Sequence, residues 1–348
     1  MFMNFSQQII NWYNTNKRSL PWRETKNPYK IWLSEIILQQ TKVAQGLPYY
    51  YKITTAFPTI KDLAKATEDE VLKLWQGLGY YSRARNLHSA AKEICEKHNG
   101  IFPNSYKDII KLKGIGTYTA AAIVSFSFDL PHAVVDGNVI RVLSRYFGVD
   151  TPSNSTEGRK EFQDLAQNLL LKGYAAENNQ AIMEFGALQC RPKSPNCNNC
   201  PLQNNCYAYS QNVISNFPTK TKKIKIKKRY FEFFIINEKD YLLIQKRKTG
   251  IWKGLYQFPL IETHYKNTES EIINSKDWRN LFNGSSVINY VSTSIKHKLS
   301  HQTIYARFWH ITGKSKPKEN VVLIRQEDIR RYPIPKLIEK YLKNIGIL

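Results

Sequence analysis

The sequence has no apolar run of the roughly 18 residues that are needed to span a bilayer, which argues against a membrane-embedded protein. Its first residues, MFMNFSQQIINWYNTNKR, also lack the basic start and apolar core of a secretion signal. We therefore expect the protein to be cytoplasmic.

Acidic residues are scarce relative to basic ones. The chain has 28 aspartates and glutamates against 51 lysines and arginines, which gives a formal net charge of +23. This excess favours a polyanionic partner, with nucleic acid ahead of an anionic membrane. At 348 residues the chain is long enough for two or three domains, each with its own core.

Cysteine is also scarce, and four of the five cysteines lie within one short segment. The fifth, Cys95, lies in a helical pattern and is expected to be a small core residue. A disulfide framework would be unusual in the cytoplasm, so the clustered thiols predict a metal site with a structural role. Zinc and a [4Fe–4S] cluster both accept four thiolates, and the spacing C-x6-C-x2-C-x5-C does not choose between them. The four residues are Cys190, Cys197, Cys200 and Cys206.

A glycine turn, Leu-Lys-Gly-Ile-Gly (112–116), opens a second notable stretch. Its glycines permit left-handed backbone or a close approach to a ligand. We expect Thr117 to cap the following helix, whose first N–H groups would suit a phosphate. Asp136 then stands at a turn after an apolar run. Locally, a cap for the helix expected over 138–147 is the favoured role for Asp136, and a catalytic carboxylate is the alternative.

Glu35 lies within a predicted helix, 29–40, whose apolar residues cover most of its circumference. A charged group is costly to bury without a partner. The helix alone favours a salt-bridged structural acid. The alternative is a carboxyl whose pKa is raised by desolvation, which could donate a proton near neutral pH.

The loop 76–85 combines two glycines, two tyrosines and two arginines before a helix. Exposed aromatic and basic side chains can stack on bases and neutralise phosphates. Alternatively, Leu78 and Tyr80 could simply pack against the helix that follows.

The texture of the sequence changes near residue 230, which predicts an all-α first domain and an α+β second domain. Residues 212–229 form a basic linker, in which alternating Ile224 and Ile226 could begin an edge strand. Strands are predicted over 230–236, 241–245 and 303–311, and a helix over 328–344.

Together, Leu33–Thr41, the turn 112–116, Val135–Asn138 and the cysteine spacing resemble the MutY-type adenine DNA glycosylases of the helix-hairpin-helix superfamily. The resemblance spans nearly the whole chain. It implies an all-α glycosylase domain over 1–211, with a six-helix barrel and a [4Fe–4S] cluster on the four cysteines. It also implies a Nudix-like domain over 230–348 that recognises 8-oxoguanine, and a cleft in which Glu35 and Asp136 face each other.

The resemblance further implies roles for individual residues. Glu35 would protonate adenine at N7, and ionised Asp136 would stabilise the positively charged sugar. Tyr118 and Asn138 would support this pair by hydrogen bonding. Matching positions of the adenine pocket are Trp22, Arg23 and Gln180. Matching DNA contacts are the wedge residues Gln40, Leu78 and Tyr80, the opposite-base contact Thr41, the backbone contacts Gly114 and Gly116, and the 8-oxoguanine readers Ser300 and His301.

Some positions depart from the pattern of the wider superfamily. Relatives that cut the DNA strand have a lysine at position 118, and Tyr118 cannot form a Schiff base, so the expected enzyme is monofunctional. The 8-oxoguanine loop commonly has phenylalanine where this chain has Leu299, and some relatives have lysine at Ile140. No Arg-Glu-x-x-Glu-Glu helix for Mg²⁺ lies between Leu260 and Asn283, so nucleotide hydrolysis is not expected.

The expected partner is therefore double-stranded DNA with adenine opposite 8-oxoguanine or guanine, bound by a monomer. Two other functions stay open from the sequence. One is a glycosylase for mismatched thymine or oxidised pyrimidines on the same scaffold. The other is a DNA-binding protein without catalysis.

Overall fold

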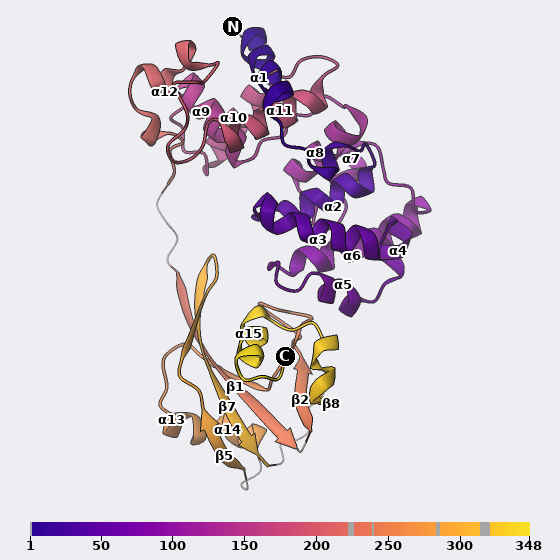
Figure 1. Ribbon diagram of the computed structural model, residues 1–348, viewed down its shortest axis with the longest axis vertical. Coiled ribbons are helices and arrows are strands. Elements are labelled where there is room, and N and C mark those ends of the chain that lie inside the picture. The colour runs from indigo at the N-terminus through magenta and orange to yellow at the C-terminus, as the bar shows by residue number, and fades with distance from the viewer. Residues whose placement is uncertain (1, 222–225, 239, 283–285, 314–320) are drawn as a thin grey trace. The chain divides into compact units, whose positions relative to one another are not determined.

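The structure is a computed structural model that describes residues 2–221, 226–238, 240–282, 286–313 and 321–348. The chain forms two compact units (Figure 1). Unit 1 comprises Met1–Lys65 and Ser89–Lys222, and unit 2 comprises Ala66–His88 and Lys223–Leu348. The boundaries at 211 and 229 stay predictions, and Ile224 lies outside the described residues.

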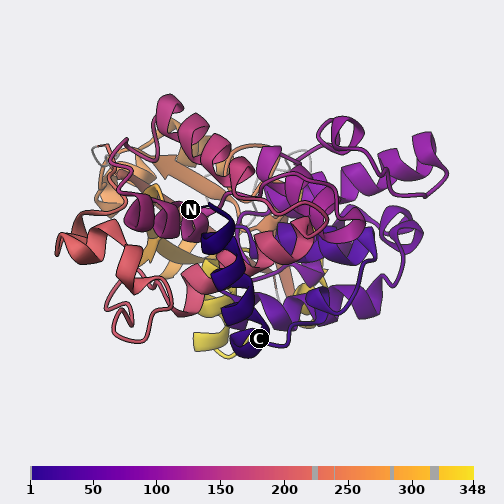
Figure 2. The same ribbon diagram turned by 90° about the horizontal axis from the view of Figure 1, so that it is seen from above.

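The described residues of unit 1 form helices and no strand, which confirms the predicted all-α domain. Helix α1 packs against α11, and α2 packs against α8. Figure 1 labels these helices, and Figure 2 shows the same ribbon from above. The helices are α1 (Phe2–Asn16), a 3-10 turn η1 (Pro21–Arg23), α2 (Pro28–Leu38), α3 (Val43–Ala56), α4 (Ile60–Lys65), α7 (Tyr106–Ile109), α8 (Thr117–Phe128), α9 (Gly137–Phe147), α10 (Thr156–Asn168), α11 (Ala175–Leu188) and α12 (Tyr207–Ser210), with shorter 3-10 turns at Gln203–Asn205 and Ile214–Asn216.

Helix α2 starts where the sequence provides a cap and a proline. The side chain of Asn27 accepts hydrogen bonds from the N–H groups of Tyr29 and Lys30, and Pro28 occupies the first turn. The helix is buried on most sides and packs against α8. The small residues Ala121 and Ala122 belong to the core cluster that it joins. This packing carries Glu35 into the interior of unit 1.

The glycine turn before α8 differs in part from the prediction. Gly114 has a left-handed backbone, with φ of 82°, but Gly116 is not left-handed, with φ of −100°. Gly116 is itself the N-cap of α8, so the expectation that Thr117 caps this helix was wrong. Thr117 already has helical backbone geometry, and a residue in that state cannot serve as the cap.

The predicted cap at the start of α9 is confirmed. Asp136 Oδ1 accepts hydrogen bonds from the N–H groups of Asn138 and Val139, both at 2.8 Å. Helices α1, α9, α10 and α11 then share a core that includes Phe5, Leu143 and Phe162. This core fixes the position of the first turn of α9 and hence of Asp136.

Unit 2 combines a mixed sheet with short helices, as predicted for an α+β domain. Its central strand β1 (Lys227–Glu238) pairs in parallel with β7 (Gln302–Thr312) and antiparallel with β2 (Tyr241–Lys246). The three predicted strands are thus confirmed. The other elements are β3 (Tyr256–Gln257), β4 (Leu260–Thr263), β5 (Val287–Val291), β6 (Ile295–Lys298), β8 (Val321–Arg325), α5 (Glu68–Leu74), α13 (Glu269–Ile273) and α14 (Lys276–Leu281); α6 (Ser82–His98) begins in unit 2 and ends in unit 1.

The helix predicted over 328–344 is interrupted. A 3-10 helix covers Gln326–Arg331, and α15 covers Lys336–Asn344. Pro333 and Pro335 lie between them, and proline lacks the N–H that a continuous helix needs. Among the described residues, no helix combines the length and apolar character that a membrane span requires.

Candidate active site

A cavity of about 590 Å³ lies within unit 1. Its wall combines residues from η1, α2, α8, α11 and the starts of α3 and α9. Of the residues predicted for catalysis, the adenine pocket and the opposite base, it brings together Trp22, Arg23, Glu35, Thr41, Tyr118, Asp136, Asn138 and Gln180. The two carboxyl groups, which are distant in the sequence, therefore border one space.

Glu35 is only 7% exposed, and burial raises its pKa to about 7. A hydrogen bond from Tyr118 and the charge of Arg23 oppose this rise, while the charge of Asp136 adds to it. The salt bridges of this wall go to another acid, Glu184. Among the described residues Glu35 forms no salt bridge, and its raised pKa favours the alternative of a carboxyl that can donate a proton near neutral pH.

Asp136 is half-buried, and its hydrogen bonds favour the charged form. Besides its two backbone hydrogen bonds, its Oδ2 accepts from Asn138 Nδ2 at 2.7 Å. Arg141 Nη2 in turn donates to Asn138 Oδ1 at 2.8 Å, which fixes the direction of that amide. Burial raises the pKa of Asp136, and the hydrogen bonds and the charge of Arg141 oppose the rise. The two carboxyls thus differ in their hydrogen bonds: Asp136 accepts three from Asn138 and Val139, whereas burial dominates the pKa of Glu35.

Glu184 is a residue of the site that the sequence analysis missed. Its side chain is 1% exposed and accepts hydrogen bonds from Arg18 and from both terminal nitrogens of Arg23, the latter at 2.9 and 2.8 Å. These bonds hold its pKa down to about 2 despite the burial. Glu184 thereby fixes Arg23 in the cavity wall. The sequence could have pointed to Glu184, because it lies four residues after Gln180 and so on the same face of a helix.

Gln180 is also held in place. The hydroxyl of Tyr13 donates to Gln180 Oε1 at 2.8 Å. The guanidinium of Arg23 lies 5.6 Å from the centre of the Tyr13 ring. One small network thus orients both the amide and the guanidinium that line the cavity.

The predicted DNA contacts lie in both units. In unit 1, Gly114 and Gly116 are exposed, and Gln40 is a non-glycine residue with left-handed backbone, φ 55°. In unit 2, Tyr80 is 41% exposed, whereas Leu78 is 5% exposed. The wedge role of Leu78 stays a prediction. Its buried side chain would have to become exposed before it could enter a duplex.

The predicted 8-oxoguanine readers lie in a turn of unit 2. Ser300 and His301 are both exposed between β6 and β7, and Leu299 N donates to Gln302 O at 2.8 Å to close the turn. The Oγ of Ser300 accepts a hydrogen bond from the hydroxyl of Tyr80. Ile140, the other departure noted in the sequence, packs against the core of unit 1.

Three of the four cysteines lie beside that same core. Cys190, Cys200 and Cys206 pack against it, and Arg145 Nη1 donates to Cys190 Sγ at 3.4 Å. Burial and the neighbouring cysteines raise the pKa of Cys200 to about 11. Such thiols need nearby positive charge to become ligands, and bound iron would supply it.

Zinc and an iron–sulfur cluster place different demands on this group. Within the described part of the chain, no three metal-binding side chains converge on a point where one ion could sit. In a [4Fe–4S] cluster each cysteine binds a different iron, so the sulfurs surround the group instead of meeting at one ion. Four thiolates in one short segment remain a donor set that both a [4Fe–4S] cluster and a zinc ion accept.

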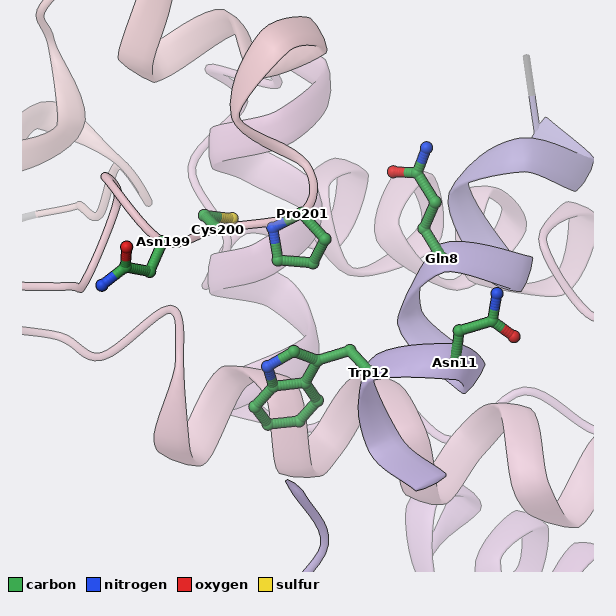
Figure 3. Close-up of a pocket in the computed structure, with 6 residues that line it drawn as sticks. All are labelled: Gln8, Asn11, Trp12, Asn199, Cys200 and Pro201. Atoms are coloured by element: carbon green, nitrogen blue, oxygen red, sulfur yellow. The ribbon is translucent and has the colours of Figure 1, made fainter. Parts of the chain in front are cut away.

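A shallow hollow of about 480 Å³ lies between α1 and the cysteine segment (Figure 3). Trp12 and Pro201 face it, and Cys200 borders it. The hollow shares no lining residue with the cavity of the carboxyl pair. None of the four cysteines lines that cavity, although Arg141 donates both to Cys190 O and to Asn138 Oδ1.

Known families match both parts of the chain. Residues 33–168 match the HhH-GPD superfamily base excision DNA repair proteins, and residues 232–344 match the NUDIX domain. An adenine DNA glycosylase of Buchnera aphidicola from Baizongia pistaciae is 41% identical in an alignment of 322 positions, which covers 89% of this chain and 87% of that protein. Another, of B. aphidicola from Acyrthosiphon pisum, is 34% identical over 98% of this chain and 97% of its own.

Solved structures resemble the helical part of the chain. A thermostable thymine-DNA glycosylase matches with a TM-score of 0.57 and 31% identity, over 60% of this chain and 97% of its own. A non-covalent endonuclease III–DNA complex matches with a TM-score of 0.53 and 20% identity, over 61% and 98%, and this likeness concerns the fold alone.

Proposed function

Since this chain belongs to the adenine DNA glycosylase family of base excision repair enzymes, we propose that it removes adenine paired with 8-oxoguanine or guanine and leaves an abasic site. The observation that carries the proposal is the pair of carboxyls in one cavity. Glu35 has a pKa near neutrality, and Asp136 is hydrogen-bonded as an anion. Excision of a base needs both states at once.

Glu35 acts as the general acid in this proposal. Protonation of adenine N7 lets the bond between N9 and the sugar break with the base leaving as a neutral molecule. A carboxyl with a pKa near the working pH is protonated often enough and still gives up its proton readily. The hydroxyl of Tyr118 holds the acid in position.

Asp136 stabilises the positive charge that develops on the sugar as the base departs. Its carboxylate is aimed by the start of α9 and by Asn138, so it needs no reorganisation when that charge appears. Water then adds to the sugar carbon and loses a proton, which leaves the abasic site. Because position 118 is a tyrosine and not a lysine, no Schiff base forms there and the strand stays intact.

The excised base enters a pocket of fixed side chains. Trp22 lines the cavity and offers an aromatic face, and the networks of Tyr13 and Glu184 fix Gln180 and Arg23. Extruding the base costs a few kcal/mol, least for a mispaired one. Tyr80 and Gln40 fill the gap in the duplex, Thr41 contacts the opposite base, and the N–H groups around Gly114 and Gly116 bind the backbone.

Recognition of 8-oxoguanine is assigned to the turn with Ser300 and His301. Both side chains are exposed and polar, and the hydrogen bond to Ser300 links this turn to the wedge tyrosine. The NUDIX match supports a nucleotide-reading fold at this position. The sequence lacks the acidic helix that would make it a hydrolase.

A panel of duplexes tests the proposed function. With adenine opposite 8-oxoguanine or guanine, we expect strand breaks only after alkali, since the enzyme leaves an abasic site without cutting. Thymine opposite guanine should remain intact, which separates this function from that of the thymine-DNA glycosylase with the similar fold. The absence of product at adenine opposite 8-oxoguanine would refute the proposal. Breaks before alkali, or a covalent complex trapped by borohydride, would refute the monofunctional mechanism alone.

The pH dependence of single-turnover excision reports the state of Glu35. Its pKa is raised to about 7, so the protonated acid is lost above that pH, and the rate should fall about tenfold per pH unit there. On the acidic side the rate should fall as Asp136 gains a proton, at a pH above its ordinary pKa because burial raises it. A flat profile between pH 6 and pH 9, roughly one unit below and two above the pKa of Glu35, would contradict the assignment.

We also propose that the four cysteines hold a [4Fe–4S] cluster with a structural role. The cluster would cross-link the segment 190–206 and would take no part in bond cleavage. Iron and acid-labile sulfide should be present in the purified protein, and Cys200→Ser should lower both together with the unfolding temperature. Cys95→Ser is the matched control and should change neither metal nor sulfide. Zinc in place of iron would contradict the proposal. A cytoplasmic location and a monomeric state stay predictions.

A further inference from the structure

The segment 66–88 interrupts the helical part of the sequence but belongs to unit 2 in space. It contains α5 and the loop with the proposed wedge residue Tyr80. The turn with Ser300 and His301 belongs to the same unit. The question is therefore what holds this inserted segment to the Nudix-like fold.

The first attachment is Asp69 on α5. Lys246 Nζ lies 2.6 Å from Asp69 Oδ1, and the hydroxyl of Tyr256 donates to Asp69 Oδ2 at 2.9 Å. Lys246 and Tyr256 are opposite each other in the pairing of β2 with β3. The pairing of β2 with β3 thus places two hydrogen-bond donors beside the carboxylate of Asp69.

The second attachment is Gln76, at the beginning of the wedge loop. Its Nε2 donates to Glu339 Oε2 at 3.0 Å, and its Oε1 accepts from Ile334 N at 3.2 Å. Glu339 is itself held by Lys336 at 3.0 Å and Lys343 at 2.9 Å. The amide of Gln76 is thereby fixed at both ends by the C-terminal part of unit 2.

The loop beyond Gln76 has a constrained shape. Gly77, Gly79 and Tyr80 have left-handed backbone, with φ of 97°, 83° and 48°. Trp75 Nε1 donates to Gly79 O at 3.0 Å, and Gly77 N donates to the hydroxyl of Tyr81 at 3.1 Å. Because the loop is closed in this way, the position of Gln76 determines the position of Tyr80. The hydroxyl of Tyr80 donates a hydrogen bond to Ser300 Oγ.

We propose that Asp69 and Gln76 are positioning residues for lesion specificity. They fasten the wedge loop to the Nudix-like fold, so that Tyr80 and the turn with Ser300 and His301 meet the strand opposite adenine as one preformed surface. Preorganisation of this kind spares the cost of ordering the loop at the moment of binding. The inference rests on the proposed function, because it assigns 8-oxoguanine recognition to that turn. Neither residue lines the cavity in which the base is excised.

The test compares single-turnover excision of adenine opposite 8-oxoguanine and opposite guanine in the full chain. In the double variant Asp69→Ala/Gln76→Ala, we expect the preference for 8-oxoguanine to fall about tenfold, a size common for coupled sites, while excision opposite guanine stays close to wild type. Asp69→Lys alone should also lower the preference for 8-oxoguanine. Adding Lys246→Asp, which exchanges the two charges, should restore most of that preference. Glu327→Gln, which alters an exposed ion pair elsewhere in unit 2, is the control.

Two outcomes would overturn the inference. One is an unchanged preference in the double variant. The other is an equal loss on both substrates, which would indicate a merely structural role. If the double variant does not fold, the milder single variants Asp69→Asn and Gln76→Leu are tested instead. The same ratio of excision rates, opposite 8-oxoguanine and opposite guanine, then decides. A wild-type chain that excises no adenine would refute the proposed function and this inference with it. A preference for 8-oxoguanine that survives in the variants would refute only the proposed role of Asp69 and Gln76.

Discussion

Replacing Glu35 by glutamine should lower the rate of adenine excision by about 10²- to 10⁴-fold, the contribution typical of general acid catalysis. Glutamine keeps the size of the side chain and can still accept the hydrogen bond from Tyr118, but it has no acidic proton to give to adenine. Affinity for DNA should be retained, because Glu35 lies inside the cavity and makes no phosphate contact in the proposal. Single-turnover kinetics and a gel-shift titration with the same duplex measure the two effects separately.

The matched control for this variant is Glu93→Gln. Glu93 lies on α6 and pairs with Lys97 at 2.7 Å, and it does not line the cavity. It should change the rate little. If Glu35→Gln excises adenine at the wild-type rate, Glu35 is not the acid. If it loses DNA binding in proportion to activity, the loss does not report the chemical step.

Replacing Asp136 by asparagine should lower excision by about 10²- to 10³-fold, as removal of a preorganised electrostatic group does in other enzymes. Asparagine is as good an N-cap as aspartate, so α9 should still begin at the same residue. The variant therefore removes the charge that faces the sugar and keeps the fold. Its unfolding midpoint should stay near that of the wild type, and this measurement is what gives the kinetic result its meaning.

Asp62→Asn is the corresponding control. Asp62 Oδ2 accepts from Thr59 N at 2.9 Å at the start of α4, so it is also a carboxylate that binds a helix start, but it lies outside the cavity. It should leave the rate unchanged. Undiminished excision by Asp136→Asn would remove Asp136 from the mechanism. A large fall in its unfolding midpoint would assign it a structural role instead.

Several features were predictable because their signals are local. Asn27 and Pro28 predict the start of α2, and Asp136 followed by an amphipathic pattern predicts the start of α9. The strands around 230–236 and 303–311 follow from runs of aromatic and β-branched residues. Pro333 and Pro335 gave an equally local signal, and the break before α15 could have been predicted from them.

Other features depend on contacts between distant parts of the chain. No local pattern shows that Glu184 holds Arg18 and Arg23, because the partners meet only when α11 packs beside the N-terminal helix. The burial of Leu78 beside an exposed Tyr80 is likewise a consequence of packing in unit 2. Asp69 and Gln76 show no sign in the sequence of their attachment to strands and helices near the C-terminus.

The sequence by itself determined which chemical groups this protein has. The spacing of four cysteines, the glycine turn, a carboxyl in an apolar helix and a carboxyl at a helix start were each evident from neighbouring residues. Only the tertiary structure decided that Glu35 and Asp136 border one cavity, and that burial raises the pKa of Glu35 to about 7 while hydrogen bonds favour the charge on Asp136. The reason is physical: a pKa depends on the solvent and charges that surround a group, and packing sets those surroundings.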